Sequence, residues 1–125
     1  TSDLSSEDLT VRSNMWEQSK IAHDFFQTYV PFSEMTAGNN LVKGDKDYVF
    51  YQENRIYLVY LKEGGEQVLD LTKANGVFNI YWFNPRAGGE LLKSNVKRVK
   101  GGKLISLGLP PQELKKDWAV LLKRD

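Results

Sequence analysis

Two apolar segments of this 125-residue chain, Arg55–Leu61 and Val77–Phe83, constrain its fold more than any other feature. In the first, both alternating sets of positions are apolar: Ile56, Leu58 and Tyr60 in one set, Tyr57, Val59 and Leu61 in the other. Successive side chains of a strand point to opposite faces, so a strand here needs cover on both sides. The second segment repeats the pattern more weakly, with Phe78, Ile80 and Trp82 on one face and Tyr81 and Phe83 on the other. We predict two strands whose aromatic side chains mainly fill a core.

Shorter segments separated by turns predict further strands. They are Asp47–Gln52, Glu66–Leu71, Glu90–Ser94, Val96–Lys100, Lys103–Ser106 and Trp118–Lys123. Glycine pairs such as Gly64-Gly65 and Gly101-Gly102 lie in the intervening turns, which is typical of hairpins. Seven or eight short strands of this kind predict an all-β antiparallel sandwich of Greek-key or Ig-like type.

The segment Thr1–Val30 is the one convincing helical region. Ser5 or Ser6 suits its N-terminus, with an alternative start at Ser13, and Pro31 disfavours helical backbone in the residue before it. Apolar residues recur along one side of this helix: Val11, Met15, Ala22, Phe26 and Tyr29, widened by Trp16 and Phe25. That side must be buried, so we predict that the helix packs on a sheet face carrying residues such as Tyr57 or Tyr81.

The segment Ala37–Asp45 contains two glycines and two asparagines and is typical of a linker or long loop. We therefore predict two parts of the chain. Residues 1–45 form the helix and linker, and residues 46–125 form the sandwich. The chain begins at Thr1, and we interpret it as a piece of a longer protein.

Composition excludes several classes of function. Seventeen basic and 16 acidic residues leave a net charge of +1, so no overall field attracts nucleic acid or an anionic membrane, and neither is expected as a partner. Cysteine is absent and His23 is the single histidine, which excludes disulfides, thiol chemistry and nearly every zinc site. No apolar run approaches the roughly 20 residues of a membrane-spanning helix, and we find no signal peptide.

Catalytic and metal-binding residues are not predicted, and no cofactor is expected. Glycoside hydrolysis needs two carboxylates that face each other across a sugar, and this sequence offers no such pair on facing strand ends. Asp45, Asp47 and Glu53 lie close together, but we interpret them as a solvated edge rather than a calcium site. We interpret the basic residues as charges that protect an edge strand from aggregation; they are Lys97, Arg98, Lys100 and Lys103.

The loop Asn84–Gly89 is the strongest candidate for a functional site. Asn84 and Pro85 start a turn, and Gly88 and Gly89 permit the positive φ angles that return the chain. Arg86 then projects from a rigid corner, where it either clamps a carboxylate or sugar hydroxyl or forms an ion pair with Asp117 or Glu90. The candidate ligand-binding residues are Tyr81, Phe83, Asn84 and Arg86. The residues interpreted as structural are Trp82, Pro85, Gly88, Asp117 and Trp118.

These motifs resemble a known family. Trp82-Phe83-Asn84-Pro85-Arg86-Ala87-Gly88 is similar to a Trp-aromatic-Asp-Pro-Arg-Thr-Gly motif in the C-terminal domain of apiosidase-like glycoside hydrolases. Pro110-Pro111 and the segment Asp117–Leu122 resemble the closing part of that domain. The earlier matches resemble its junction with a barrel: Trp16, Ala22, Phe25-Phe26, Pro31-Phe32, Glu34-Met35, Tyr57–Leu61 and Gly64-Gly65. That domain carries the label "putative collagen-binding domain of a collagenase".

The resemblance implies a parent enzyme with a (β/α)8 barrel acting on glycans, in which Thr1–Val30 would be the last barrel helix. It implies that this chain is a non-catalytic accessory domain of a secreted, periplasmic or cell-surface bacterial protein, and that its partner is the barrel, which it braces. The alternative is a binding module for collagen or polysaccharide. The sequence departs from the motif at Asn84 and Ala87; an amide at position 84 supplies an acceptor without a charge.

Overall fold

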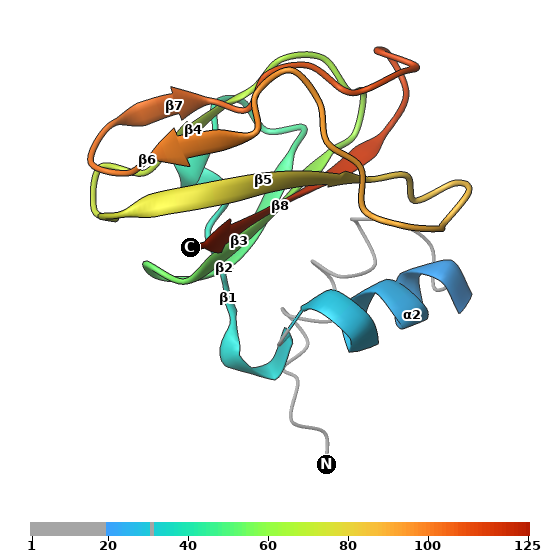
Figure 1. Ribbon diagram of the computed structural model, residues 1–125, viewed down its shortest axis with the longest axis horizontal. Helices are drawn as coiled ribbons and strands as arrows, with labels where there is room; N and C mark the ends of the chain where they lie inside the picture. The colour runs from blue at the N-terminus through green and yellow to red at the C-terminus, as the bar shows by residue number, and fades with distance from the viewer. Residues whose placement is uncertain (1–19, 31) are drawn as a thin grey trace.

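The computed structural model describes residues 20–30 and 32–125 of the chain (Figure 1). The predicted helix start at Ser5, Ser6 or Ser13 and the residues Val11, Met15 and Trp16 lie outside this part. Of the side chains of Ala22, His23 and Phe26 nothing is described. The predicted helix is present from Lys20 to Tyr29 as α2.

The other described elements are short. Two 3-10 turns flank the first strand: η1 is Phe32–Glu34, β1 is Thr36–Ala37 and η2 is Asn39–Leu41. The strands that follow are β2 Tyr48–Gln52, β3 Ile56–Leu61, β4 Val68–Asp70, β5 Val77–Phe83, β6 Arg98–Lys100, β7 Leu104–Ser106 and β8 Trp118–Arg124.

The strands within the described residues form two antiparallel sheets. The larger has the order β1-β2-β3-β8-β5-β6, and the smaller pairs β4 with β7. β8 therefore lies in the middle of the large sheet, with Leu58 opposite Leu121 on one side and Tyr81 opposite Leu121 on the other. Between β6 and β7 the chain passes from the large sheet to the small one through Gly101 and Gly102. The prediction of an all-β antiparallel sandwich is confirmed.

The two sheets enclose the main core. Side chains of β3, β5 and β8 face the small sheet from one side, including Val59, Ile80 and Val120, each with no exposed area. Leu69 of β4, Ile105 of β7 and the neighbouring residues Leu71 and Leu107 close this core from the other side. Trp82 and Trp118 are fully buried in it, and their rings meet edge to face with centroids 6.1 Å apart.

A second core covers the opposite face of the large sheet. Figure 1 shows α2 below the sheet and the strands β4 and β7 above it. Phe25 of α2 is 1% exposed and packs with the alternate residues of the strands: Phe50, Leu58, Tyr60, Phe83 and Leu121. All six residues of β3 are consequently buried, which confirms that this strand is covered on both sides.

The partner face of the helix was only partly predicted. Tyr81 does pack against the helix-side core, but Tyr57 belongs to the core between the sheets. There its ring stacks on Tyr51 at 5.5 Å and meets the edge of Phe78 at 5.6 Å. The reason is the alternation of β3, in which Tyr57 points away from its neighbours Ile56 and Leu58.

Two segments differ from the sequence-based expectation. Within Glu90–Ser94 the structure has a single bridge, between Leu92 and Trp82, instead of a strand. Conversely, the expected linker Ala37–Asp45 contains the end of β1, η2 and the buried residue Val42, which bridges to Leu69. The large sheet therefore includes residues that precede position 46. Within the described residues, no helix has the length and apolarity that crossing a bilayer requires.

Candidate functional site

The corner after β5 is built on the side chain of Asn84. Its Oδ1 atom accepts hydrogen bonds from the backbone N–H groups of Arg86, at 2.9 Å, and Ala87, at 3.2 Å. Its backbone oxygen accepts a third from the N–H of Gly88, at 2.8 Å. Asn84 is 8% exposed, so its amide serves the turn as an uncharged acceptor.

Gly88 completes this turn and lies beside α2. Its φ angle of 75° falls in the left-handed region that favours glycine, and a Cβ atom there would lie 3.5 Å from the side chain of Ile21. The loop that follows β5 therefore touches the helix directly. A cavity of about 260 Å³ lies at this contact and is lined by Ile21, Phe25, Ala87 and Gly89 among others.

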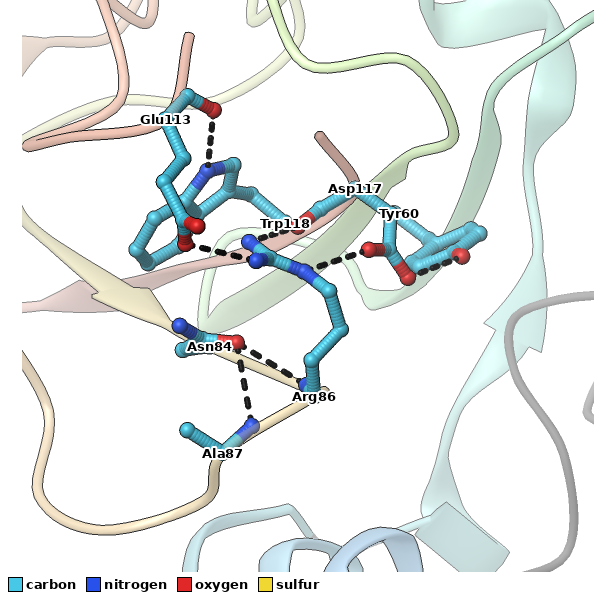
Figure 2. A network of polar contacts seen from close by, with 7 residues as sticks. All are labelled: Tyr60, Asn84, Arg86, Ala87, Glu113, Asp117 and Trp118. Atoms are coloured by element: carbon cyan, nitrogen blue, oxygen red, sulfur yellow. Dashed lines mark hydrogen bonds and ion pairs between the residues drawn. The ribbon is translucent and has the colours of Figure 1, made fainter. Parts of the chain in front are cut away.

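Arg86 connects this corner to the segment before β8 (Figure 2). Its Nε donates to Oδ1 of Asp117 at 2.8 Å, and its Nη2 donates to the backbone oxygen of Asp117 at 3.0 Å. Its Nη1 donates to Oε1 of Glu113 at 2.6 Å, and the guanidinium carbon lies 5.4 Å from the ring centre of Trp118. The predicted ion pair with Asp117 is confirmed, and the second carboxylate is that of Glu113 rather than Glu90.

Tyr60 extends the network to β3. Its hydroxyl donates to Oδ2 of Asp117 at 2.7 Å, so both carboxylate oxygens of Asp117 are bound, one by Arg86 and one by Tyr60. Burial raises the pKa of the Tyr60 hydroxyl well above its ordinary value, and the hydrogen bond to Asp117 raises it further. For Arg86, burial alone would lower the pKa, but the hydrogen bonds to Glu113 and Asp117 outweigh it and raise the pKa. Arg86 therefore stays charged.

Glu113, like Tyr60, is a member of this network that sequence reasoning missed. Its φ angle is 46°, a left-handed conformation that few residues other than glycine and asparagine adopt. This backbone turn aims its oxygen at Nε1 of Trp118, which donates at 3.2 Å, while its side chain reaches Arg86. Nothing in the sequence marks it, because its role depends on that conformation and not on a motif.

The other candidate residues are occupied by packing. Phe83 is 3% exposed, and its ring centre lies 4.4 Å from that of Phe25 on α2. Tyr81 is half-buried, with Nζ of Lys93 5.5 Å from its ring centre. Pro85 is buried. Trp82 Nε1 is buried and has no hydrogen-bond partner among the described residues. The structure thus brings together Asn84, Arg86, Asp117 and Trp118 but leaves little of Phe83 to meet a ligand.

The remaining charged clusters also have structural contacts. Asp47 accepts hydrogen bonds from the N–H of Lys62, at 3.0 Å, and from the side chain of Gln67, at 2.8 Å. In the described part of the chain, no three His, Cys, Asp or Glu residues are grouped as metal ligands. The basic segment around β6 lies at one edge of the large sheet, where Arg98 forms an ion pair with Asp125.

The fold and this corner define the class of the protein. It is an antiparallel β-sandwich domain in which buried Asn84 holds the turn after β5 and Arg86 forms ion pairs with Glu113 and Asp117. It is similar to part of a solved "Glycoside hydrolase", with a TM-score of 0.67, 16% identity, and coverage of 86% of this chain and 25% of that one. It is also similar to a glycoside hydrolase family 5 structure from Bacteroides vulgatus, with a TM-score of 0.59, 17% identity, and coverage of 94% and 23%. The chain thus spans about a quarter of their length.

The chain belongs to the family described as "Putative collagen-binding domain of a collagenase", whose model matches residues 30–123. The matched region includes the small sheet, the large sheet except the last residue of β8, and the whole Arg86 network. No curated protein matches the sequence.

Proposed function

We propose that this chain is a non-catalytic accessory domain of a secreted glycoside hydrolase-like protein of the apiosidase-like type, and that it braces the catalytic domain. Family membership and the likeness to one quarter of larger chains named as glycoside hydrolases support the accessory role. Its partner would be the catalytic barrel of the same parent chain, and its location the cell exterior, periplasm or cell surface.

The observation that carries the bracing role is the packing of α2. Phe25 and Ile21 lie on the sandwich, and Phe25 is as buried as a core residue. By the resemblance described above, this helix would be the last helix of the barrel. A helix that belongs to one domain and is buried in the core of the next makes a rigid joint between them. We place that joint within residues 20–35, before β1.

The test measures catalytic inactivation in the longer protein that contains this chain. Trp118→Ala removes a fully buried side chain of the sandwich core, and Leu104→Ala, at a position 55% exposed, is the matched control. We expect the temperature of half-inactivation to fall with the unfolding temperature of the sandwich in Trp118→Ala, and to stay unchanged in Leu104→Ala. Full activity above the temperature at which the sandwich unfolds would refute bracing.

The description of the family favours a second candidate, a collagen-binding module. A collagen triple helix requires an extended trough, and the motif residues would have to line it. Asn84 and Phe83 are buried, and Arg86 binds two carboxylates of its own chain. These contacts support the bracing role over collagen binding at this corner.

A further inference from the structure

A cavity of about 540 Å³ lies at the opposite end of β3 from the Arg86 network. Its walls are Tyr29 at the end of α2, Gln52 and Asn54–Ile56 around the β2–β3 turn, and Lys123–Asp125 at the end of β8. The volume lies within the range of about 300 to 1,000 Å³ that small-ligand sites occupy.

Strand register places a polar row across the large sheet at this end. Gln52 is opposite Ile56, Ile56 is opposite Lys123, Lys123 is opposite Asn79, and Asn79 is opposite Arg98. Directly opposed residues share a face, and Ile56 belongs to the helix-side core, so this row lies on the face that carries α2. The rows before it are apolar and covered by the helix; this one is polar.

The charge of the cavity wall is unbalanced. Arg55, Lys123 and Arg124 line it, against the single carboxylate side chain of Asp125. That carboxylate is already bound, by an ion pair with Arg98 and by the Nδ2 group of Asn79 at 3.3 Å. Among the described residues, Arg55 and Lys123 form no ion pair. The row therefore already holds one carboxylate, that of Asp125, and Lys123 in the row and Arg55 beside it are available for another.

The wall is also held in place. Asn54 has a φ angle of 66°, and its Oδ1 accepts the N–H of Asn75 at 2.8 Å. Its own N–H donates to the hydroxyl of Tyr57 at 3.0 Å. Arg124 Nη2 donates to Oδ1 of Asn75 at 3.1 Å. A rigid turn reduces the conformational entropy that a ligand would have to order.

We propose that this cavity binds a carboxylate-bearing sugar, with Lys123 and Arg55 facing the carboxylate and the amide of Gln52 facing hydroxyl groups. An extended acidic peptide fits less well, because strand addition needs an unpaired sheet edge, and the edges of the large sheet are β1 and β6, which do not line the cavity. The site is independent of the bracing role and of the Arg86 corner.

The experiment titrates the labelled chain with a β-1,4-linked glucuronate trimer and follows backbone amide signals by NMR. Cellotriose, which differs only in having CH₂OH in place of each carboxylate, is the neutral match. We expect the glucuronate trimer to shift the signals of residues 52–56 and 122–125, and cellotriose to shift them far less. Lys123→Gln should weaken binding about fivefold or more, as for loss of one charge-assisted contact. Lys43→Gln, an exposed lysine away from the cavity, should have no effect.

Two further measurements distinguish specific sugar binding from general attraction between charges: the effect of salt and the binding of an acidic peptide. About 0.5 M NaCl should weaken binding of the glucuronate trimer, because the cations are exposed. Equal binding of cellotriose, equal effects of Lys123→Gln and Lys43→Gln, or shifts centred elsewhere would overturn the proposal. A hexaglutamate peptide that shifts the same signals with equal affinity would overturn it too, and would assign the cavity to acidic peptides.

Discussion

At the scale of single residues, the Arg86 network joins three parts of the chain that are distant in sequence: β3, the loop after β5 and the segment before β8. Arg86 supplies three donors in a fixed planar group, two to Asp117 and one to Glu113. A lysine would supply a single point charge, which cannot reproduce this forked geometry. The network also prevents free rotation of Arg86. We therefore assign the side chain a structural role rather than a ligand-binding one.

We predict that Arg86→Lys lowers the free energy of unfolding by about 1 to 3 kcal/mol, as for loss of hydrogen bonds between charged, partly buried groups. The matched control is Lys46→Ala, which removes an ion pair with Glu63 whose side chains are 63% and 64% exposed. That pair should contribute little to stability, because both groups are exposed and water screens their attraction. Urea unfolding of both variants decides the matter, and equal losses would contradict a structural role for Arg86.

The raised pKa of Tyr60 predicts a pH dependence. In the unfolded chain a tyrosine hydroxyl loses its proton near pH 10, whereas folded Tyr60 keeps its proton to higher pH. Above about pH 10 the folded state therefore binds more protons than the unfolded state, and the stability contributed by Tyr60 falls as pH rises through its folded pKa.

Tyr60→Phe should accordingly be less stable than the parent chain at pH 8 by about 1 kcal/mol, the usual loss for one hydrogen bond. The difference should shrink between about pH 10 and 12, because a phenylalanine side chain has no proton to lose. The pKa of Tyr57 is also raised, but Tyr57 is present in both the parent chain and the variant, so its contribution cancels in the difference between their stabilities. Chemical denaturation over this pH range tests it, and parallel curves would show that the Tyr60 hydroxyl is not held protonated.

Sequence reasoning reached part of this site. The Asn-Pro-Arg turn, the ion pair with Asp117 and the burial of both tryptophans follow from turn chemistry and alternation. Glu113 and Tyr60 could not be predicted, since each contact depends on the distance between segments that only the folded chain brings together.

At the scale of elements, α2 behaves as a layer of the domain. Phe25 contacts Tyr29 within the helix and Phe83 on the sheet, with ring centres 5.6 Å and 4.4 Å apart. The helix was predictable because its apolar stripe needed a partner. Strand β1 was not predictable, because its two exposed residues, Thr36 and Ala37, show no hydrophobic pattern. They pair with Tyr51 and Phe50 because the packing of α2 places the following chain beside that edge of the sheet.

We predict that Phe25→Ala lowers the free energy of unfolding by about 3 to 5 kcal/mol, as for a buried aromatic side chain in a core. Gln27→Ala, at an exposed position on the same helix, controls for changes in helix propensity and should cost less than about 0.5 kcal/mol. Thermal and urea unfolding measure both. A small, equal effect of the two substitutions would mean that α2 is loosely attached and that the joint with a preceding domain is flexible.

At the scale of the whole molecule, the sandwich class and the two-sided cover of β3 were predictable, because an alternating apolar pattern on both faces permits few other arrangements. The unequal sizes of the sheets were not predictable. Strand pairing depends on crossovers such as that of β8 into the large sheet, and hydrophobic periodicity does not report which strands are neighbours.

We predict that the chain binds neither triple-helical collagen nor gelatin appreciably at physiological salt. A net charge of +1 gives no general attraction, and the aromatic residues of the two cores are buried. Surface plasmon resonance against triple-helical peptides tests this. Saturable micromolar binding that is lost in Arg86→Ala or Tyr81→Ala would favour the collagen-binding module instead.

The central place of β8 has a consequence for the order of events during synthesis. β3 and β5 are each paired to β8 and not to one another, and β8 leaves the ribosome after every other strand. Until then, β1-β2-β3 and β5-β6 are two unjoined halves with apolar strand edges open to other chains. Folding of the large sheet must wait for β8, so the edges of β3 and β5 stay open to aggregation until the end of the domain has been synthesised.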